Sequence, residues 1–584
     1  MTVTPGNAAP DSDTNAAAAT LDRRGFVRST VAAVLTVPLT GLGATPARPR
    51  ASTRRTRADL LLRGAMVYDG TGAPPVRADV RVSGDRITEI AQTLSRGASQ
   101  DVDLRGLALA PGFIDIHAHT DTVLLSFPRA ESKIRQGVTT EIAGQDGSSV
   151  APSSAERTAR LRVQYASEVG IAVDVSTLRG FFRAIETRRS SVNLASMVGA
   201  GTVRGLVVGD EDRPPTDVEL DRMTQHVREA IADGACGLSS GLEYVPGGFA
   251  DTHELAALAR PLRGTGLPYA SHMRNEDDNL LAAVEEAIAV GRTAGVPVQI
   301  SHLKAQGERN WWKAGAVLHT IETARAAGID VHFDRYPYVA YATGLSNLFP
   351  LWARDGGTPA FLERLRQPET LARIEASVRD KIDQLGSWDA VQITSTGNDE
   401  LVWARGRRFG QLASERRTEP FALLLEITFA DQNRTGMVGF GMSEDNTARI
   451  LAHPLGMICS DGSALAADGP LARGSPHPRS FGTFPRVLGH YCRERRIMPL
   501  ETAVHKMTGM PATKLRLEGR GRITVGAFAD LVAFDPATVA DRATFERPHQ
   551  YPAGIPWVIV NGEIVVGDGE HTGATPGRVL RAAN

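Results

Sequence analysis

The chain has 584 residues, too many for one ordinary compact core, so we expect a large domain with a smaller companion. Its 65 basic and 66 acidic residues give a formal charge of −1, and no basic block with interleaved aromatic residues is present, which excludes a nucleic-acid-binding class. No apolar run reaches the roughly 20 residues that span a bilayer, so we expect no stable membrane anchor in the mature protein.

The first 50 residues are typical of a targeting segment and not of a folded domain. Arg23-Arg24-Gly25-Phe26 precedes a modestly apolar stretch at residues 31–42, which is followed by small residues and prolines. This pattern resembles a twin-arginine export signal, which predicts recognition by the twin-arginine export machinery and a periplasmic or extracellular location. The alternative is a disordered basic tail. The three cysteines lie far from this segment, and their odd number argues against a disulfide framework.

Short strand-like runs separated by turn residues follow at residues 60–62, 66–68, 80–82 and 87–90. The C-terminal part has the same character at residues 523–534 and 557–566, and Asn561-Gly562 in the second run is a hairpin signal. We therefore predict one small β-sandwich assembled from residues 58–109 and 520–575.

Between these ends, strand-like runs alternate with helical ones, which is the pattern of a parallel barrel. The predicted strands lie at residues 113–116, 138–142, 192–196, 235–238, 269–272, 298–302 and 330–333. Residues 282–294 and 317–327 are predicted helices, closed by Gly295 and Gly328. The fold class is thus α/β, with a (β/α)8 TIM-type barrel over residues 110–519. Residues 347–441 interrupt the alternation, so we expect an insertion over the barrel mouth there, a candidate lid.

The pair His117 and His119 ends the first predicted barrel strand, in the segment PGFIDIHAHTD. Residues two apart on a strand point to the same side, so both imidazoles can face one point at the C-terminal end of the barrel. A lone pair of this kind is more often structural than metal-binding. Whether His117 and His119 bind a metal therefore depends on which other side chains lie close to them.

His272 and His302 each follow a short strand-like run and lie 30 residues apart, about one βα unit. They are expected to project from adjacent strand ends toward His117 and His119. Imidazole is a common zinc ligand, and three or four protein ligands with an open position are typical of a catalytic site. The four histidines together predict a metal centre at the barrel mouth.

Asp461 follows the apolar run 457–459, where the last barrel strand is expected. A hydrolytic metal site needs a group that accepts a proton from water and passes it to the leaving amine, and a carboxylate in this place can do so. An aspartate before glycine is otherwise usually a turn residue. In this context we interpret Asp461 as the catalytic acid and base.

With these residues in place, the chain resembles the amidohydrolase superfamily and, within it, the D-aminoacylase or N-acyl-D-amino-acid deacylase family. The resemblance extends over nearly the whole chain after the signal segment, and it is carried by PGFIDIHAHTD, RQGVTTEIAG, GLSSGLEYVPG, YASHMRNE, VQISHLKAQG, RYPY, SDG and HPRSFGTFPRVLG. It implies a barrel with a small β-sandwich, one or two zinc ions, and a small-molecule substrate. The implied reaction is hydrolysis of N-acyl-D-amino acids to a carboxylate and a free D-amino acid.

The sequence departs from this family at one position. The family typically has a cysteine metal ligand in a GNCG segment, whereas this chain has Gly144-Gln145-Asp146-Gly147. Asp146 occupies the place of the cysteine, and a carboxylate can also bind or bridge zinc. The alternative is an ordinary turn aspartate, so the number of metal ions stays open.

The resemblance also suggests substrate-binding residues. Arg479 matches an arginine that grips the substrate carboxylate, for which a guanidinium can use two parallel hydrogen bonds. Lys304 and Tyr336 match positions that line the pocket, and Tyr244 is a further candidate. We expect His332 to be structural.

Two other classes of protein would share part of this pattern. A cyclic amidase of the hydantoinase or dihydroorotase type typically bridges two metals with a carboxylated lysine, but no lysine occurs between Asp146 and His272. Glu243 or Asp146 could supply a bridge of another kind, so a cyclic amidase or a D-peptidase remains the alternative. A binding protein on an inactive scaffold should have lost ligands, whereas the four histidines and Asp461 are all present.

Overall fold

The computed structural model describes residues 59–582, so the predicted export signal lies outside the described residues. Within that range, none of the helices combines the length and the apolar character that crossing a membrane requires. The described residues form four sheets, two of which are parallel and together form a barrel.

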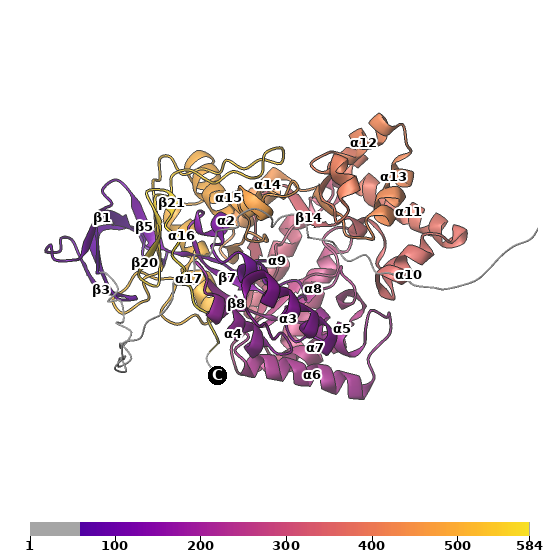
Figure 1. The fold of residues 1–584 in the computed structure, drawn as a ribbon, viewed down its shortest axis with the longest axis horizontal. Coiled ribbons are helices and arrows are strands. Elements are labelled where there is room, and N and C mark those ends of the chain that lie inside the picture. The colour runs from indigo at the N-terminus through magenta and orange to yellow at the C-terminus, as the bar shows by residue number, and fades with distance from the viewer. Residues whose placement is uncertain (1–58, 583–584) are drawn as a thin grey trace, which may run out of the picture. The chain divides into compact units, whose positions relative to one another are not determined.

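A nine-stranded sheet joins strands from both ends of the described chain, so that indigo and yellow segments lie together in Figure 1. Its order is β21-β20-β19-β18-β5-β1-β2-β3, with β4 paired to β1. The strands are β1 (Leu60–Val67), β2 (Val76–Ser83), β3 (Arg86–Ala91), β4 (Gln100–Asp103), β5 (Ala108–Pro111), β18 (Leu531–Phe534), β19 (Trp557–Val560), β20 (Glu563–Gly567) and β21 (Glu570–His571). Antiparallel pairing of β18 with β5 joins the two ends of the chain.

This sheet curls back on itself. Ile87 in β3 accepts a backbone hydrogen bond from Gly526 (2.8 Å) and donates one to Ala527 (2.9 Å), just before β18. Buried residues from β1, β2 and β18, among them Leu62 and Val80, form one hydrophobic cluster. The predicted sandwich therefore takes the form of a single curled sheet around a core.

The predicted hairpin is present between β19 and β20. Asn561 and Gly562 have φ angles of 48° and 78°, the left-handed conformation that a two-residue type I′ turn needs at both central positions.

Eight strand positions form the barrel, because β8 and β9 are separated by a single residue and continue one another. They are β6 (Phe113–Asp115), β7 (Val138–Ala143), β8 and β9 (Asn193–Ser196, Val198–Gly199), β10 (Leu238–Gly241), β11 (Tyr269–His272), β12 (Val298–Ile300), β13 (Val331–Arg335) and β17 (Gly456–Ile458). Parallel pairing runs through β6-β7-β8 and through β9-β10-β11-β12-β13-β17. Backbone bonds from Asp461 to His117 (2.9 Å) and from His119 to Gly462 (3.0 Å) close the ring.

One predicted strand was placed too early. The run at 235–238 was expected to be a strand, but β10 begins at Leu238 and continues to Gly241. Ala235 and Cys236 lie in the connection after α6, where both are buried, and buried apolar residues in a short connection resemble a strand in the sequence.

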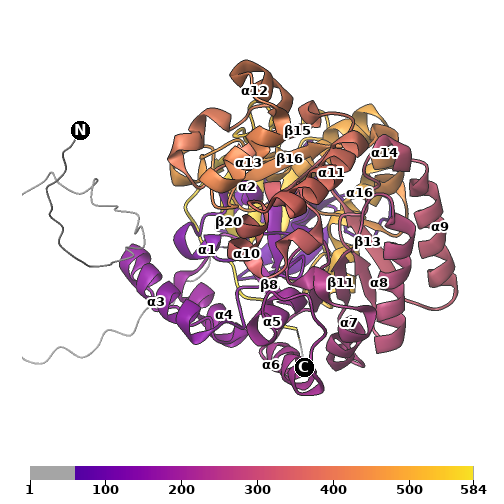
Figure 2. The same cartoon turned by 90° about the vertical axis from the view of Figure 1, so that its right-hand side faces the viewer.

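The helices of the barrel follow the strands, and several of them surround it in Figure 2. They are α1 (Val123–Ser126), α2 (Glu131–Ile134), α3 (Ala155–Val169), α4 (Leu178–Arg188), α5 (Ala200–Val207), α6 (Asp217–Ala232), α7 (Thr252–Ala259), α8 (Leu280–Ala294), α9 (Lys313–Ala326), α14 (Glu444–Ala452), α15 (Arg479–Arg486), α16 (Leu500–Met507) and α17 (Gly509–Lys514). The predicted helix at 282–294 corresponds to α8, which Gly295 ends in a left-handed conformation.

An insertion separates β13 from α14 and contains its own antiparallel sheet, of order β14-β16-β15. Its elements are β14 (Ala340–Gly344), α10 (Gly357–Arg364), α11 (Pro368–Leu385), β15 (Val391–Ser395), α12 (Phe409–Arg416), α13 (Pro420–Ala430) and β16 (Gly436–Phe440). Because β14 pairs with β16, this sheet begins before the predicted boundary at residue 347. Tyr341, Thr343 and Asn347 line the cavity at the barrel mouth, so the insertion forms one of its walls.

A buried lysine holds the closing seam of the barrel. Lys133 from α2 donates to Asp115 (2.8 Å), to Ser460 (2.9 Å) and to the backbone oxygen of Gly462 (2.8 Å), and it forms an ion pair with Glu141 (2.7 Å). The lysine and both carboxylates are fully buried. One ammonium group thus ties β6 and β7 to the segment after β17, directly before His117 and Asp461.

We predict that Lys133→Met destabilises the protein by about 3–5 kcal/mol, because it leaves two carboxylates buried without a cation. Urea unfolding at a fixed zinc concentration measures this, since bound metal also stabilises the folded state. Arg63→Met is the matched control, because the Arg63–Asp101 pair (3.4 Å) is partly exposed and should contribute no more than about 1 kcal/mol. Equal losses in the two variants would contradict the role given to Lys133.

Candidate metal centre

A cavity of about 480 Å³ opens at the C-terminal ends of the barrel strands, where the first predicted site residues lie. His119, Asp146, His272, His302 and Asp461 all line it. His117 lies beside them and is fully buried. The structure therefore brings together the four histidines and both aspartates that the sequence singled out.

The barrel strands position the imidazoles. His117 and His119 follow β6, and their ring centroids lie 5.2 Å apart. His272 is the last residue of β11, and His302 follows β12 with a positive φ of 34°. His272 Nδ1 and His302 Nε2 are 2.9 Å apart, so a ring nitrogen of each imidazole points to the same place.

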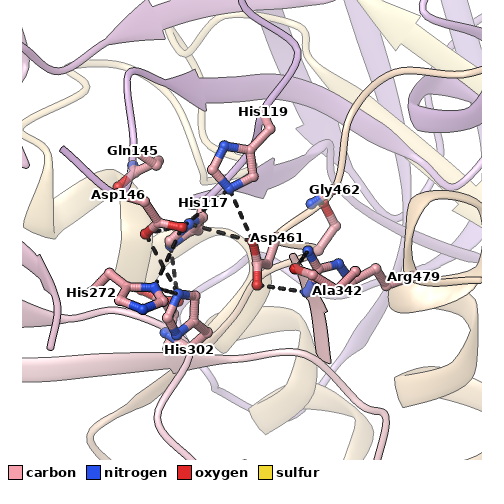
Figure 3. Close-up of polar contacts among 12 residues, drawn as sticks. His117, His119, Gln145, Asp146, His272, His302, Ala342, Asp461, Gly462 and Arg479 are labelled. Carbon is pink, nitrogen blue, oxygen red and sulfur yellow. Dashed lines mark hydrogen bonds and ion pairs between the residues drawn. The ribbon is translucent and has the colours of Figure 1, made fainter. Parts of the chain in front are cut away.

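The Asp146 carboxylate lies between the two pairs of histidines, as Figure 3 shows. Its Oδ1 is 3.2 Å from His117 Nε2 and 3.5 Å from His302 Nε2. Its Oδ2 is 3.4 Å from His119 Nε2 and 3.6 Å from His272 Nδ1. Each oxygen thus faces one imidazole from each pair, the arrangement of a bridging ligand.

Close backbone packing holds the Asp146 loop. Asp146 has a left-handed backbone with φ of 52°, which an aspartate tolerates better than most side chains do. A Cβ at Gly241 would lie 2.0 Å from the backbone oxygen of Asp146, and one at Gly199 would lie 2.4 Å from that of Gly147. Glycine at these strand ends therefore lets the loop press against β9 and β10 and fixes the carboxylate.

Asp461 sits on the opposite side of the centre. Its Oδ1 is 3.0 Å from His119 Nε2, and its Oδ2 accepts a 2.7 Å hydrogen bond from Arg479. Burial alone would raise the pKa of the Asp461 carboxyl, but Arg479 and the neighbouring histidines outweigh burial and hold that pKa well below its usual range. Asp461 is therefore ionised at neutral pH.

A carboxylate also faces the outer nitrogen of three of the imidazoles. Asp334 is 3.6 Å from His117 Nδ1, Glu276 is 3.0 Å from His302 Nδ1, and Glu243 is 3.6 Å from His272 Nε2. Carboxylates in this position fix the orientation and the basicity of metal-binding histidines. Asp334 and Glu276 were not among the predicted site residues, although each comes at or shortly after a strand end that carries one.

The donor set fits a metal ion. Both nitrogens of His117, Nε2 of His272 and Oδ1 of Asp146 are buried without a hydrogen-bond partner. Potential ligand atoms of His117, Asp146, His302 and Asp461 all lie within 4.8 Å of one another. Nitrogen and carboxylate donors at this spacing suit zinc.

The electrostatics favour positive charge at the same point. Burial would lower the pKa of His119, but Asp146 and Asp461 outweigh it and raise that pKa to about 9. In the same way Glu276 and Asp146 outweigh burial and raise the pKa of His272 to about 10. The centre thus stabilises a cation, which a divalent ion satisfies as well as protons do.

All four predicted substrate-binding residues line the same cavity. Lys304 Nζ lies 2.6 Å from Glu276 and 2.6 Å from His302 Nδ1. The phenol of Tyr336 is buried without a hydrogen-bond partner, and the hydroxyl of Tyr244 accepts a hydrogen bond from Thr343 (3.2 Å). His332, expected to be structural, is 3.1 Å from Asp330 and is not among the residues that line this cavity.

Known proteins are similar to this chain in sequence and in fold. The sequence profile of the Amidohydrolase family matches residues 100–334 and 436–566, which leaves out most of the insertion. A D-aminoacylase of Alcaligenes xylosoxydans xylosoxydans is 39% identical over 529 residues, which cover 89% of this chain and 97% of that protein. An N-acyl-D-glutamate deacylase of the same organism is 35% identical over 524 residues, which cover 90% and 96%.

A solved structure is similar as well. The crystal structure of N-acyl-D-glutamate deacylase from Bordetella bronchiseptica, in complex with zinc and a phosphonate that mimics the tetrahedral intermediate, superposes with a TM-score of 0.75 at 34% identity. The match covers 90% of this chain and all of that chain.

We predict that Asp146→Ala lowers the affinity for zinc at least about 10–100-fold, since even the loss of an outer partner of a metal ligand costs that much. Competition with a chromophoric chelator, together with metal analysis of the purified protein, measures the change. Asp146→Cys is the matched control, because a thiolate also binds zinc and should retain most of the affinity. An Asp146→Ala protein with unchanged zinc affinity and stoichiometry would show that Asp146 is only a turn residue.

Proposed function

The chain belongs to the amidohydrolase family, and from this premise we propose that it hydrolyses the amide bond of N-acyl-D-amino acids to a carboxylate and a free D-amino acid. One observation carries the proposal: four imidazoles, Asp146 and an ionised Asp461 converge on one cavity, in a chain that matches deacylases over nine-tenths of its length.

We propose that His117, His119, Asp146, His272 and His302 hold the zinc. When bound, zinc supplies Lewis acidity, which polarises the amide carbonyl and makes water a better nucleophile at neutral pH. Three carboxylates lie at the outer ring nitrogens of His117, His302 and His272 and orient these imidazoles; they belong to Asp334, Glu276 and Glu243. The remaining chemistry is positioning and proton transfer by the side chains of the cavity.

Asp461 is the proton-transfer group in this proposal. Oδ1 accepts a proton from the attacking water as the water oxygen bonds to the carbonyl carbon, and then returns it to the amide nitrogen as the C–N bond breaks. Arg479 holds the other oxygen of the same carboxylate at 2.7 Å, which fixes its orientation. The products are the acyl carboxylate and the free amine.

Cationic groups cluster on one wall, where the substrate α-carboxylate would bind. Arg479 and Lys304 line it and lie 5.0 and 5.7 Å from the ring centroid of Tyr336, whose phenol is available as a donor. Arg335 lies 4.5 Å from the same centroid, outside the cavity lining. Nη1 of Arg479 donates to Asp461, so the two-bond grip predicted for Arg479 would use its Nε and Nη2. Lys304 and Tyr336 line the cavity beside it and complete the carboxylate site.

The cyclic-amidase alternative finds no support at the centre. The position between the two pairs of histidines is held by Asp146, and the lysine that lines the cavity, Lys304, is paired with Glu276. A bridging carboxylated lysine has no counterpart in this arrangement.

We predict release of amine from N-acetyl-D-amino acids by the zinc-loaded protein and little or none from the L enantiomers. Asp461→Asn should lower kcat by about 10²–10⁴-fold, because it removes the proton-transfer group. Zinc content serves as the control and should stay close to that of the unaltered protein. The proposal fails if neither enantiomeric series is hydrolysed, or if Asp461→Asn retains full activity with zinc bound.

We further propose that the protein is exported through the twin-arginine pathway to a periplasmic or extracellular location. The support is the segment Arg23-Arg24-Gly25-Phe26 and the weakly apolar stretch that follows it. Twin-arginine export carries folded proteins, which suits an enzyme that acquires its metal before it crosses the membrane.

Replacing both arginines, Arg23→Lys together with Arg24→Lys, is expected to retain the protein in the cytoplasm of a host that has the pathway. Fractionation followed by immunoblotting measures the distribution. Arg28→Lys is the matched control, because it lies outside the arginine pair. Equal export of the paired variant and the control would overturn this proposal.

A further inference from the structure

We propose that the cavity selects N-acyl-D-amino acids whose side chains carry no negative charge. This inference rests on the proposed deacylase function and specifies the substrate class of the same site. It follows from the positions of the charged side chains around the cavity.

Apart from imidazoles, two basic side chains line the cavity, Lys304 and Arg479, in the part of the chain that the structure describes. Lys304 pairs with Glu276 at 2.6 Å and Arg479 pairs with Asp461 at 2.7 Å, and all four side chains are buried. Both cations stand on the wall that would take the α-carboxylate. In the proposed reaction the metal centre faces the scissile amide, so it does not serve the substrate side chain.

Another wall of the cavity carries a carboxylate. Glu243 lines the cavity, with its side chain 14% exposed, and its Oε2 accepts a hydrogen bond from Asn347 (3.2 Å). Two cations lie behind this wall: Arg354 donates to the backbone oxygen of Glu243 (3.0 Å), and Lys381 pairs with Asp277 (2.6 Å). Both line a neighbouring pocket, which shares Glu243 and Asn347 with the cavity, and neither lines the cavity itself. Tyr341 and Thr343 line the same wall, so Glu243 is the charged side chain that this wall presents to the cavity.

The remaining arm of the cavity is uncharged. Gly147, Ser148, Gly201, Thr202 and Gly247 line it. A neutral side chain fits this arm or the Glu243 wall, whereas a carboxylate finds no basic side chain lining the cavity in either place, among the described residues. Burying an unpaired carboxylate, or placing it beside a like charge, is strongly unfavourable.

Two isosteric pairs test the charge alone: N-acetyl-D-glutamine against N-acetyl-D-glutamate, and N-acetyl-D-asparagine against N-acetyl-D-aspartate. We expect kcat/KM to be at least about tenfold higher for the amide of each pair. Equal or faster hydrolysis of the acids would overturn the inference and leave the deacylase function standing. No hydrolysis of these four compounds or of N-acetyl-D-leucine would instead overturn the proposed function, and this inference with it.

A substitution beside Glu243 tests whether the charge of this wall causes the selectivity. Asn347→Lys places a cation beside Glu243 and should raise kcat/KM for N-acetyl-D-glutamate about tenfold relative to N-acetyl-D-glutamine. Asn347→Gln is the matched control, because it enlarges the side chain without adding charge and should leave the ratio of the two substrates unchanged. An identical ratio in both variants, with zinc content retained, would show that the charge of this wall does not set selectivity.

Discussion

The Asp146 carboxylate among four imidazoles is the interaction on which the rest of the site depends. Without it, the two pairs of histidines would have no carboxylate between them, although within the second pair His272 Nδ1 and His302 Nε2 are only 2.9 Å apart. Each oxygen of Asp146 instead faces one imidazole of each pair. The carboxylate reaches this point because its loop is pressed between strand ends where glycine leaves room for the backbone.

Fixed carboxylates also determine where every cation of the cavity sits. Glu276 holds Lys304, Asp461 holds Arg479, and beneath them Asp115 and Glu141 hold Lys133 at the seam of the barrel. Such pairs are oriented before any substrate arrives, so little reorganisation is needed during reaction. The same pairing explains why buried charges are tolerated so close to an apolar barrel core.

The sequence was informative where function requires a particular residue type at a strand end or a turn. His117 with His119, Asp461 after the last strand and the Asn561-Gly562 turn each carry a local signal, and the structure places them as predicted. Lys133, Glu276 and Asp334 carried no such signal, because their roles depend on partners brought close only by the fold. The run at 235–238 was misplaced for a related reason: burial in a connection and burial in a strand look alike in one sequence.

The distribution of paired and unpaired charge finally bears on which ligands the cavity can accept. A cation that already has a buried carboxylate partner gains less from a second anion, because the first attraction must be weakened to make the new one. Lys304 and Arg479 each have such a partner, Glu276 and Asp461. The α-carboxylate of a substrate therefore shares these two cations with the carboxylates that already bind them. Glu243, in contrast, has imidazole and amide neighbours but no lysine or arginine ion pair among the described residues. The negative charge of Glu243 therefore determines which substrate side chains the wall around it can accept.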